Sequence, residues 1–269
     1  MEYKIAAFDF DGTLRAGSQP QINPYVVKTL KQLQKAGIPV VVATGRSFGG
    51  LSPKLLGGFR PDYYVCANGS QVLDSKGSPL YTRQMTPEEM YALVDFSEDY
   101  ELPLGFTFTD AYYIYVGYET MRDFYSNVTG SGDLCRDGED MDHHLVEMPY
   151  GAFTLMPVEY SRRFVEKYPH LDLQFFYYSD LAADIVHKDT NKAKGLEFLL
   201  NRLGLDPSQL VAVGDSNNDL EMLRYAGLGV AMGNADPSVK EVADRVCPSD
   251  EENGAATLCR QVFPQVFES

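Results

Sequence analysis

The stretch YKIAAFDFDGT, residues 3–13, decides the fold because an apolar run ends in two acids and a glycine. Residues 3–10 are apolar and continuous enough to predict a buried strand. Asp9 and Asp11, followed by Gly12, stand where this strand ends and the chain must turn. In an open parallel sheet, ligands bind at this carboxyl edge. The stretch therefore predicts a central strand with a candidate site at its end.

Similar strands and helices alternate at both ends of the chain. Asn23 and Pro24 are typical of a helix start, and this helix leads to apolar strands at 39–43 and 62–67. The alternation returns from Lys192 as a helix to 203, a strand at 210–214, a helix at 219–226, and a further strand, helix and strand at 228–231, 237–243 and 246–247. Nearly continuous apolar strands indicate a parallel sheet covered on both faces. We predict an α/β fold with a doubly wound, Rossmann-like core.

The middle of the chain has a different pattern, typical of an α+β insertion. A capping box at 86–89 predicts a helix to about residue 100. The other expected elements are strands at 104–109, 112–116, 153–156, 171–177 and 182–186, a helix from 118, and a polar stretch at 130–142. The tyrosines at 112–115 alternate as a strand would, so one face should be core and the other could touch substrate. The predicted domains are a core formed by 1–82 and 186–269, and an inserted α+β domain at 83–185.

Composition limits the possible partners. The 269 residues include 23 Lys and Arg against 38 Asp and Glu, a formal net charge of −15. Such a surface repels nucleic acid and anionic membrane, because both are bound through basic patches. Apolar runs fall well short of the ~20 residues that span a bilayer, and the four cysteines show no metal-ligand spacing. We expect a cytoplasmic protein, a monomer or small homo-oligomer, in which a negatively charged small substrate would have to be met locally by a metal or a few well-placed donors.

Three further polar clusters follow predicted strands or begin a helix. Thr44 and Gly45 come after the second strand, where a hydroxyl and amides can hold phosphate. Lys192 begins a helix, and Lys194 lies roughly 200° around it, so only one of the two should face a site. The segment 214–219 supplies Asp215, Asn218 and Asp219 in one turn.

Each cluster alone has an ordinary structural explanation. An Asp pair before glycine is often a solvated turn, and the other clusters could be helix caps or surface charge. Their co-occurrence at one sheet edge removes these explanations. The acids of the first and last clusters, with a Thr, an Asn and a Lys, together favour a magnesium ion and a phosphoryl group held against an attacking aspartate.

The four clusters resemble the motifs of the haloacid dehalogenase superfamily. DFDGT, ATGR, the Lys192 segment and GDSNND are similar to its Cof-type branch (subfamily IIB), which has a large inserted cap, as is the run VAMGNA at 230–235. The resemblance implies that the insertion at 83–185 is a cap that sets substrate specificity. It also implies a magnesium-dependent phosphatase that acts on a small phosphorylated metabolite. We expect it to hydrolyse a phosphomonoester, a sugar phosphate, through an aspartyl-phosphate intermediate.

The resemblance also implies residue roles. Asp9 would be the nucleophile and Asp11 the acid–base. Mg²⁺ would bind Asp9, Asp215 and the backbone carbonyl of Asp11. The phosphate would be held by Thr44, Gly45, Lys192 and Asn218. Asp219 would orient the metal shell or Lys192, which is preferred to Lys194 because it fits the helix start of the family.

Two alternatives stay open. A phosphomutase would use the same residues and return the phosphate to substrate. A non-enzymatic switch, resembling response-regulator receivers, would be phosphorylated on aspartate to change partner binding. Receivers are shorter, however, and lack both the second Asp in this register and the inserted cap.

Overall fold

The computed structural model describes residues 3–128 and 132–267, which divide into two compact units. The first unit comprises 1–45, 51–81 and 191–269, and the second comprises 46–50 and 82–190, so far as these ranges are described. The domain bounds that we predicted stay a prediction. Residues 130 and 131, which begin the predicted polar stretch, lie outside the described residues.

The described part of the first unit contains an eight-stranded sheet with the strand order β14-β13-β12-β1-β2-β3-β4-β5. Its strands are β1 (Ile5–Phe8), β2 (Val40–Ala43), β3 (Tyr63–Cys66), β4 (Gln71–Asp74), β5 (Pro79–Thr82), β12 (Leu210–Gly214), β13 (Leu228–Ala231) and β14 (Arg245–Val246). Strands β14 to β3 pair in parallel, whereas β4 pairs with β3 in the antiparallel sense. The parallel strands were predicted; the β4 and β5 strands were not.

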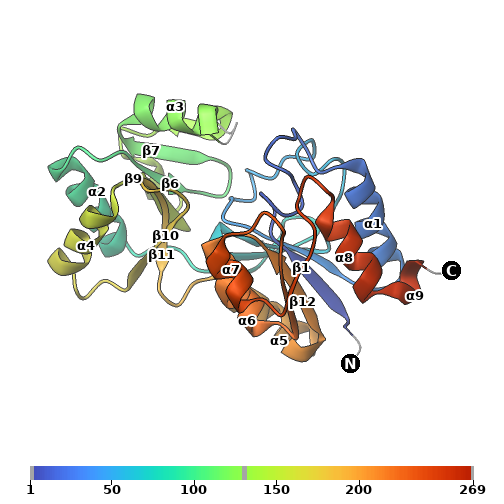
Figure 1. The fold of residues 1–269 in the computed structure, drawn as a ribbon. Coiled ribbons are helices and arrows are strands. Elements are labelled where there is room, and N and C mark those ends of the chain that lie inside the picture. Colours follow the sequence, from blue (N-terminus) through green and yellow to red (C-terminus); the bar gives the residue numbers. More distant parts are fainter. Residues whose placement is uncertain (1–2, 129–131, 268–269) are drawn as a thin grey trace. The chain divides into compact units, whose positions relative to one another are not determined.

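Helices cover the two faces of this sheet (Figure 1). They are α1 (Pro24–Lys35), α8 (Gly254–Val262) and α9 (Pro264–Phe267) on one face, and α5 (Lys192–Leu203), α6 (Leu220–Tyr225) and α7 (Pro237–Val242) on the other. Every residue of β1, β2 and β12 is buried. Because both faces are covered, these strands read as continuous apolar runs.

Strand β1 lies between β2 and β12, and this order positions the site. The register pairs Phe8 with Val42 on one side and with Val213 on the other. Residues that follow these three strands therefore meet at one sheet edge. Asp9, Thr44 and Asp215 all follow their strands within two residues.

The second unit is an α+β structure, as the sequence predicts for the insertion. Its described residues include a six-stranded sheet with the order β10-β11-β9-β6-β7-β8. The strands are β6 (Leu104–Thr107), β7 (Tyr112–Val116), β8 (Cys135–Asp137), β9 (Gly151–Leu155), β10 (Leu173–Tyr177) and β11 (Ala182–His187). The helices are α2 (Pro87–Asp99), α3 (Tyr118–Val128) and α4 (Val158–Lys167). Helices α2 and α4 lie on one face of this sheet and α3 on the other (Figure 1).

The tyrosine-rich strand β7 carries core residues on both faces. Tyr112 and Ile114 pack in a core with residues of α3, while Tyr115 packs in the core that α2 supplies. Tyr113 and Val116 are half-buried, and contact of this strand with substrate stays a prediction. Among the described residues, no helix is both long and apolar enough to cross a membrane.

Candidate active site

Asp9 follows β1 directly and lies at the centre of the first unit's polar edge. Its side chain is buried, with 6% of the residue exposed, and its backbone N–H donates to the Val213 carbonyl at 2.9 Å. Gly12 then turns the chain with a φ of +78°. A Cβ on Gly12 would lie 2.3 Å from Asp215 Oδ2, so only glycine allows this approach.

Lys192 joins two of the acids in a buried ion-pair network. Its Nζ donates to Asp9 Oδ1 at 2.5 Å and to Asp219 Oδ1 at 2.7 Å, and the lysine side chain is fully buried. Asn191 caps the helix by accepting from the Lys194 backbone N–H at 2.9 Å. The Lys194 ammonium pairs with Glu197 instead, on an exposed surface. Lys192, and not Lys194, thus reaches the acids.

The pKa values of this network follow from burial and from an excess of negative charge. Burial raises the pKa of Asp9 well above its usual value; Lys192 opposes this rise, and the Asp219 and Asp215 carboxylates add to it. Burial opposes the charge on Lys192, but Asp219 and Asp9 outweigh burial and raise the pKa of the lysine. Lys192 is therefore a permanent cation beside Asp9.

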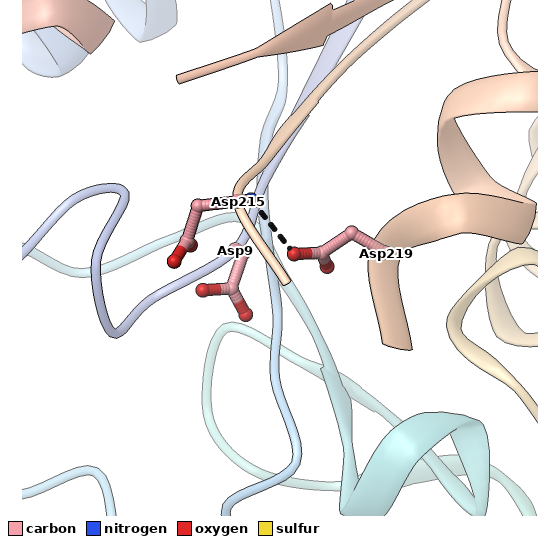
Figure 2. Close-up of side chains that lie close together, drawn as sticks. All are labelled: Asp9, Asp215 and Asp219. Carbon is pink, nitrogen blue, oxygen red and sulfur yellow. Dashed lines mark hydrogen bonds between the residues drawn. The ribbon is translucent and has the colours of Figure 1, made fainter. Parts of the chain in front are cut away.

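Three carboxylates gather closely enough to share a cation. Asp9, Asp215 and Asp219 each offer an oxygen, and these atoms lie within 4.8 Å of one another (Figure 2). Asp219 Oδ1 accepts from Lys192, and its Oδ2 accepts from the backbone N–H groups of Asp215 at 2.9 Å and Ser216 at 3.0 Å. Both Asp219 oxygens are thus used to hold other groups. The Asp215 oxygens accept from hydroxyl groups, which can rotate away, and Asp9 has its Oδ2 besides the oxygen that holds Lys192. These two acids are therefore better suited than Asp219 to bind metal, and hard oxygen donors suit Mg²⁺.

Asp215 accepts hydrogen bonds from two hydroxyl groups and lies close to another carboxylate. Thr13 Oγ1 donates to Asp215 Oδ1 at 2.8 Å, and Ser216 Oγ donates to its Oδ2 at 3.3 Å. Burial is the largest influence and, with the Asp219 carboxylate, raises the pKa of Asp215 to about 7, although the Thr13 hydrogen bond and the Lys192 charge oppose this rise. A bound divalent cation would reverse this preference for the neutral acid. The residues present therefore fit Mg²⁺.

Asp11 has a different partner from the other acids. Arg15 donates to Asp11 Oδ1 through Nε at 3.0 Å and through Nη2 at 2.5 Å. The Asp11 side chain is 39% exposed, and that of Arg15 is 12% exposed. Asp11 thus stands at the open side of the site, held by an arginine that the sequence analysis did not select.

Thr44 and Asn218 are linked through a residue that the sequence analysis also passed over. The Thr44 backbone carbonyl accepts from the Asn68 N–H at 3.1 Å, and Asn218 Nδ2 donates to Asn68 Oδ1 at 2.9 Å. Thr44 is 2% exposed and Gly45 lies in the bend after it. The available signals for Asn68 were its place just beyond a predicted strand and the glycine that follows it, which together indicate a turn.

Asn234, within the run at 230–235, holds the turn that follows β1 through a hydrogen bond to its backbone. Its Nδ2 donates to the Gly12 carbonyl at 2.8 Å, and its Oδ1 accepts from the Asp250 N–H at 3.0 Å. The asparagine thus connects the turn that carries Asp11 to the loop before α8.

The eight site residues selected from the sequence all belong to the first unit: Asp9, Asp11, Thr44, Gly45, Lys192, Asp215, Asn218 and Asp219. Their roles stay a prediction.

Comparison with known proteins places this geometry in a family. Residues 6–258 match the model of the family described as haloacid dehalogenase-like hydrolase. The 5-amino-6-(5-phospho-D-ribitylamino)uracil phosphatase YitU of Bacillus subtilis is 30% identical over 268 residues, which cover 96% of this chain and 97% of that protein. The phosphoglycolate phosphatase of Methanopyrus kandleri is 30% identical over 260 residues, with 96% of each chain covered.

Solved structures show the same fold. BT1666 from Bacteroides thetaiotaomicron, described among phosphatases of the superfamily, superposes with a TM-score of 0.86 at 22% identity, covering 97% of this chain and 95% of that one. The subclass IIB sugar phosphatase BT4131 gives 0.82 at 22% identity, covering 96% and 98%. The predicted fold class is thereby confirmed, and so is the resemblance drawn from the four motifs.

Proposed function

The chain belongs to the haloacid dehalogenase-like hydrolase family and is a phosphatase, and we propose that it hydrolyses a small phosphomonoester through a phosphorylated Asp9. The observation that carries this proposal is the buried network in which Lys192 bridges Asp9 and Asp219, with Asp215 beside them. A buried carboxylate held by a cation at the end of a central strand suits nucleophilic attack on phosphorus.

Each residue has a place in the proposed reaction. An Asp9 oxygen bonds to phosphorus while the bond from phosphorus to the leaving oxygen breaks, and Asp11 gives that oxygen a proton. Water then attacks the phospho-aspartate and gives its proton to Asp11, so that inorganic phosphate leaves and Asp9 is restored. Two carboxylates with different surroundings can divide the two roles.

The remaining residues hold charge. Lys192, Asn218 and the Thr44–Gly45 turn would bind the phosphoryl oxygens, where charge spreads in the transition state. Asp219 would hold Lys192 and the 214–216 backbone in place. Mg²⁺, bound by Asp9, Asp215 and the Asp11 carbonyl, would supply the positive charge that lets an anion attack a phosphate dianion.

We propose a sugar phosphate or a related polyol phosphate as substrate. Support comes from the ribityl phosphate that YitU is named for and from the sugar phosphatase among the structural neighbours. Four free, buried thiols accord with a reducing compartment, so we propose a cytoplasmic enzyme. The net charge of −15 argues against nucleic acid or membrane as a partner.

The test is phosphate release from p-nitrophenyl phosphate with Mg²⁺. The wild type should turn over repeatedly and release inorganic phosphate, which a phosphomutase or a switch would not do. Asp9→Asn should abolish turnover because the nucleophile is lost. Its thermal melting profile should stay that of a folded protein, because the substitution removes a buried charge. The matched control is Asp95→Asn, an exposed aspartate of α2, which should leave turnover unchanged. Substantial activity in Asp9→Asn would refute the assignment of the nucleophile.

A further inference from the structure

Three consecutive residues after β3 adopt left-handed backbone conformations. Ala67, Asn68 and Gly69 have φ values of 47°, 53° and 101°, and all three are buried. Left-handed conformations are unfavourable for a non-glycine residue, although Asn tolerates them better than most. Such a turn persists only where its surroundings hold it in place.

The first turn of α5 holds this loop. A Cβ on Gly69 would lie 2.1 Å from the Asn191 carbonyl oxygen, and a Cβ on Gly195 would lie 2.5 Å from Val65 Cγ1. The loop and the helix start are therefore in backbone contact. Because α5 begins with Lys192, the loop 67–69 is fixed to the same helix turn that carries the buried lysine.

The side chain of Asn68 crosses to the segment at 214–219. It is 2% exposed, and its Oδ1 accepts from Asn218 Nδ2 at 2.9 Å across 150 residues of sequence. Asn218 Oδ1 is buried without a hydrogen-bond partner among the described residues. An amide nitrogen carries two N–H bonds, so fixing one of them fixes the plane of the amide and the direction of the second.

We propose that Asn68 is a positioning residue, which holds the Asn218 amide so that its second N–H can bind the transferred phosphoryl group. This inference rests on the proposed function of Asn218. The strained turn places Asn68 Oδ1 2.9 Å from Asn218 Nδ2, and the loop that carries Asn68 contacts the start of α5, where Lys192 lies. Preorganised donors lose effect when they are misplaced by about 1 Å, and the loss can reach roughly 10²-fold.

The experiment is a double-mutant cycle with Asn68→Gly and Asn218→Ala, assayed with p-nitrophenyl phosphate and Mg²⁺. Glycine accepts the left-handed backbone and removes only the side chain. Asn68→Gly should lower kcat/KM roughly tenfold and weaken inhibition by orthovanadate by a similar factor, because the analogue binds through the same donors. In the Asn218→Ala background, Asn68→Gly should cause no further loss.

Asn253→Gly is the matched control. Asn253 also has a left-handed φ, of 58°, and makes no side-chain capping bond at the start of α8. The change Asn to Gly is thus the same, without the contact to Asn218, and activity should stay that of the wild type. Asn68→Ser is a second variant that removes the contact, because its hydroxyl is too short to reach the amide; folded Asn68→Ser should show the same loss although serine is more strained than glycine at this φ.

Two results would overturn the inference. One is wild-type kcat/KM and vanadate inhibition in a folded Asn68 variant. The other is a loss that multiplies with that of Asn218→Ala, because independent losses mean that Asn68 does not act through Asn218. Both results can be obtained only if the wild-type enzyme turns over substrate. If the wild type shows no turnover, the proposed function itself is refuted, so failure of the inference and failure of the proposed function are distinguishable.

Discussion

Asp215→Asn should stabilise the metal-free protein at neutral and alkaline pH. In the folded protein the pKa of Asp215 is raised from 3.8 to about 7, chiefly by burial and by the Asp219 carboxylate. The pKa of Asp215 is higher in the folded than in the unfolded state. The contribution of this one group to the free energy of unfolding is therefore fully present below about pH 4 and is lost as the pH rises through about 7. Asparagine does not titrate, and its side-chain oxygen can still accept from Thr13.

The size of the effect follows from the pKa difference. Ionisation of Asp215 costs the folded state about 4 kcal/mol at about pH 8.5, where both states are ionised. At about pH 5.5 Asp215 is ionised mainly in the unfolded state, and the loss of folding stability due to this group is about 2 kcal/mol. Asp215→Asn should therefore gain about 2 kcal/mol over the wild type between these two pH values.

The assay is urea denaturation followed by circular dichroism, in EDTA. The lower pH stays above the isoelectric point of 4.6, since a protein near zero net charge tends to associate. Asp95→Asn, which removes an exposed charge, is the control and should follow the wild type at each pH. Mg²⁺ should stabilise the wild type most at high pH and should have little effect on Asp215→Asn, because the ligand carboxylate is gone.

Two outcomes would refute this reasoning. If Asp215→Asn is no more stable than the wild type at high pH, the buried carboxylate is not destabilising. If its advantage is the same at both pH values, the gain comes from packing and not from the removed ionisation.

Two further predictions concern catalysis. Activity should require Mg²⁺ and be poorly supported by Ca²⁺, because calcium prefers more ligands and longer bonds that would let Asp9 bind it through both oxygens; equal rates with the two metals, in metal-stripped enzyme, would contradict the site. Asp11→Asn should lower kcat/KM for a sugar phosphate by ~10²–10⁴-fold and much less for p-nitrophenyl phosphate, because p-nitrophenolate leaves without a proton. With p-nitrophenyl phosphate, Asp11→Asn should show a burst of nitrophenolate before slow turnover, because Asp11 also accepts the proton of the water that attacks the phospho-aspartate. Equal losses of kcat/KM for the two substrates, with no burst, would mean that Asp11 has only a structural role.

Short-range patterns in the sequence were sufficient to predict the core strands and the first acids. The runs that became β1, β2 and β12 are apolar throughout because helices cover both faces of the sheet. Polar residues directly after such runs must lie at the sheet edge, so Asp9 and Asp215 could be selected without coordinates. The helix start at Lys192 was readable for the same reason, since caps are local.

Other local features were missed because their signals are weak or ambiguous. Strands β4 and β5 are four residues each, and β5 is largely exposed, so it lacks a continuous apolar run. The strand predicted to reach residue 67 ends at Cys66, because Ala67 turns into the left-handed region. Asn followed by Gly indicates a turn, but it does not reveal what the asparagine side chain will bind.

Contacts between distant segments were decided by the tertiary structure alone. Asn68 meets Asn218 across 150 residues, Lys192 meets Asp9 across 183, and Thr13 meets Asp215 across 202. Periodicity and capping act over a few residues, so they can place each side chain at an edge but cannot pair it with a partner. The pairing follows from the strand order, in which β1 lies between β2 and β12, and from the packing of α5 against the loop after β3. The residue types at the site were therefore set by the sequence, whereas their hydrogen bonds and raised pKa values arise only when burial brings the charges together.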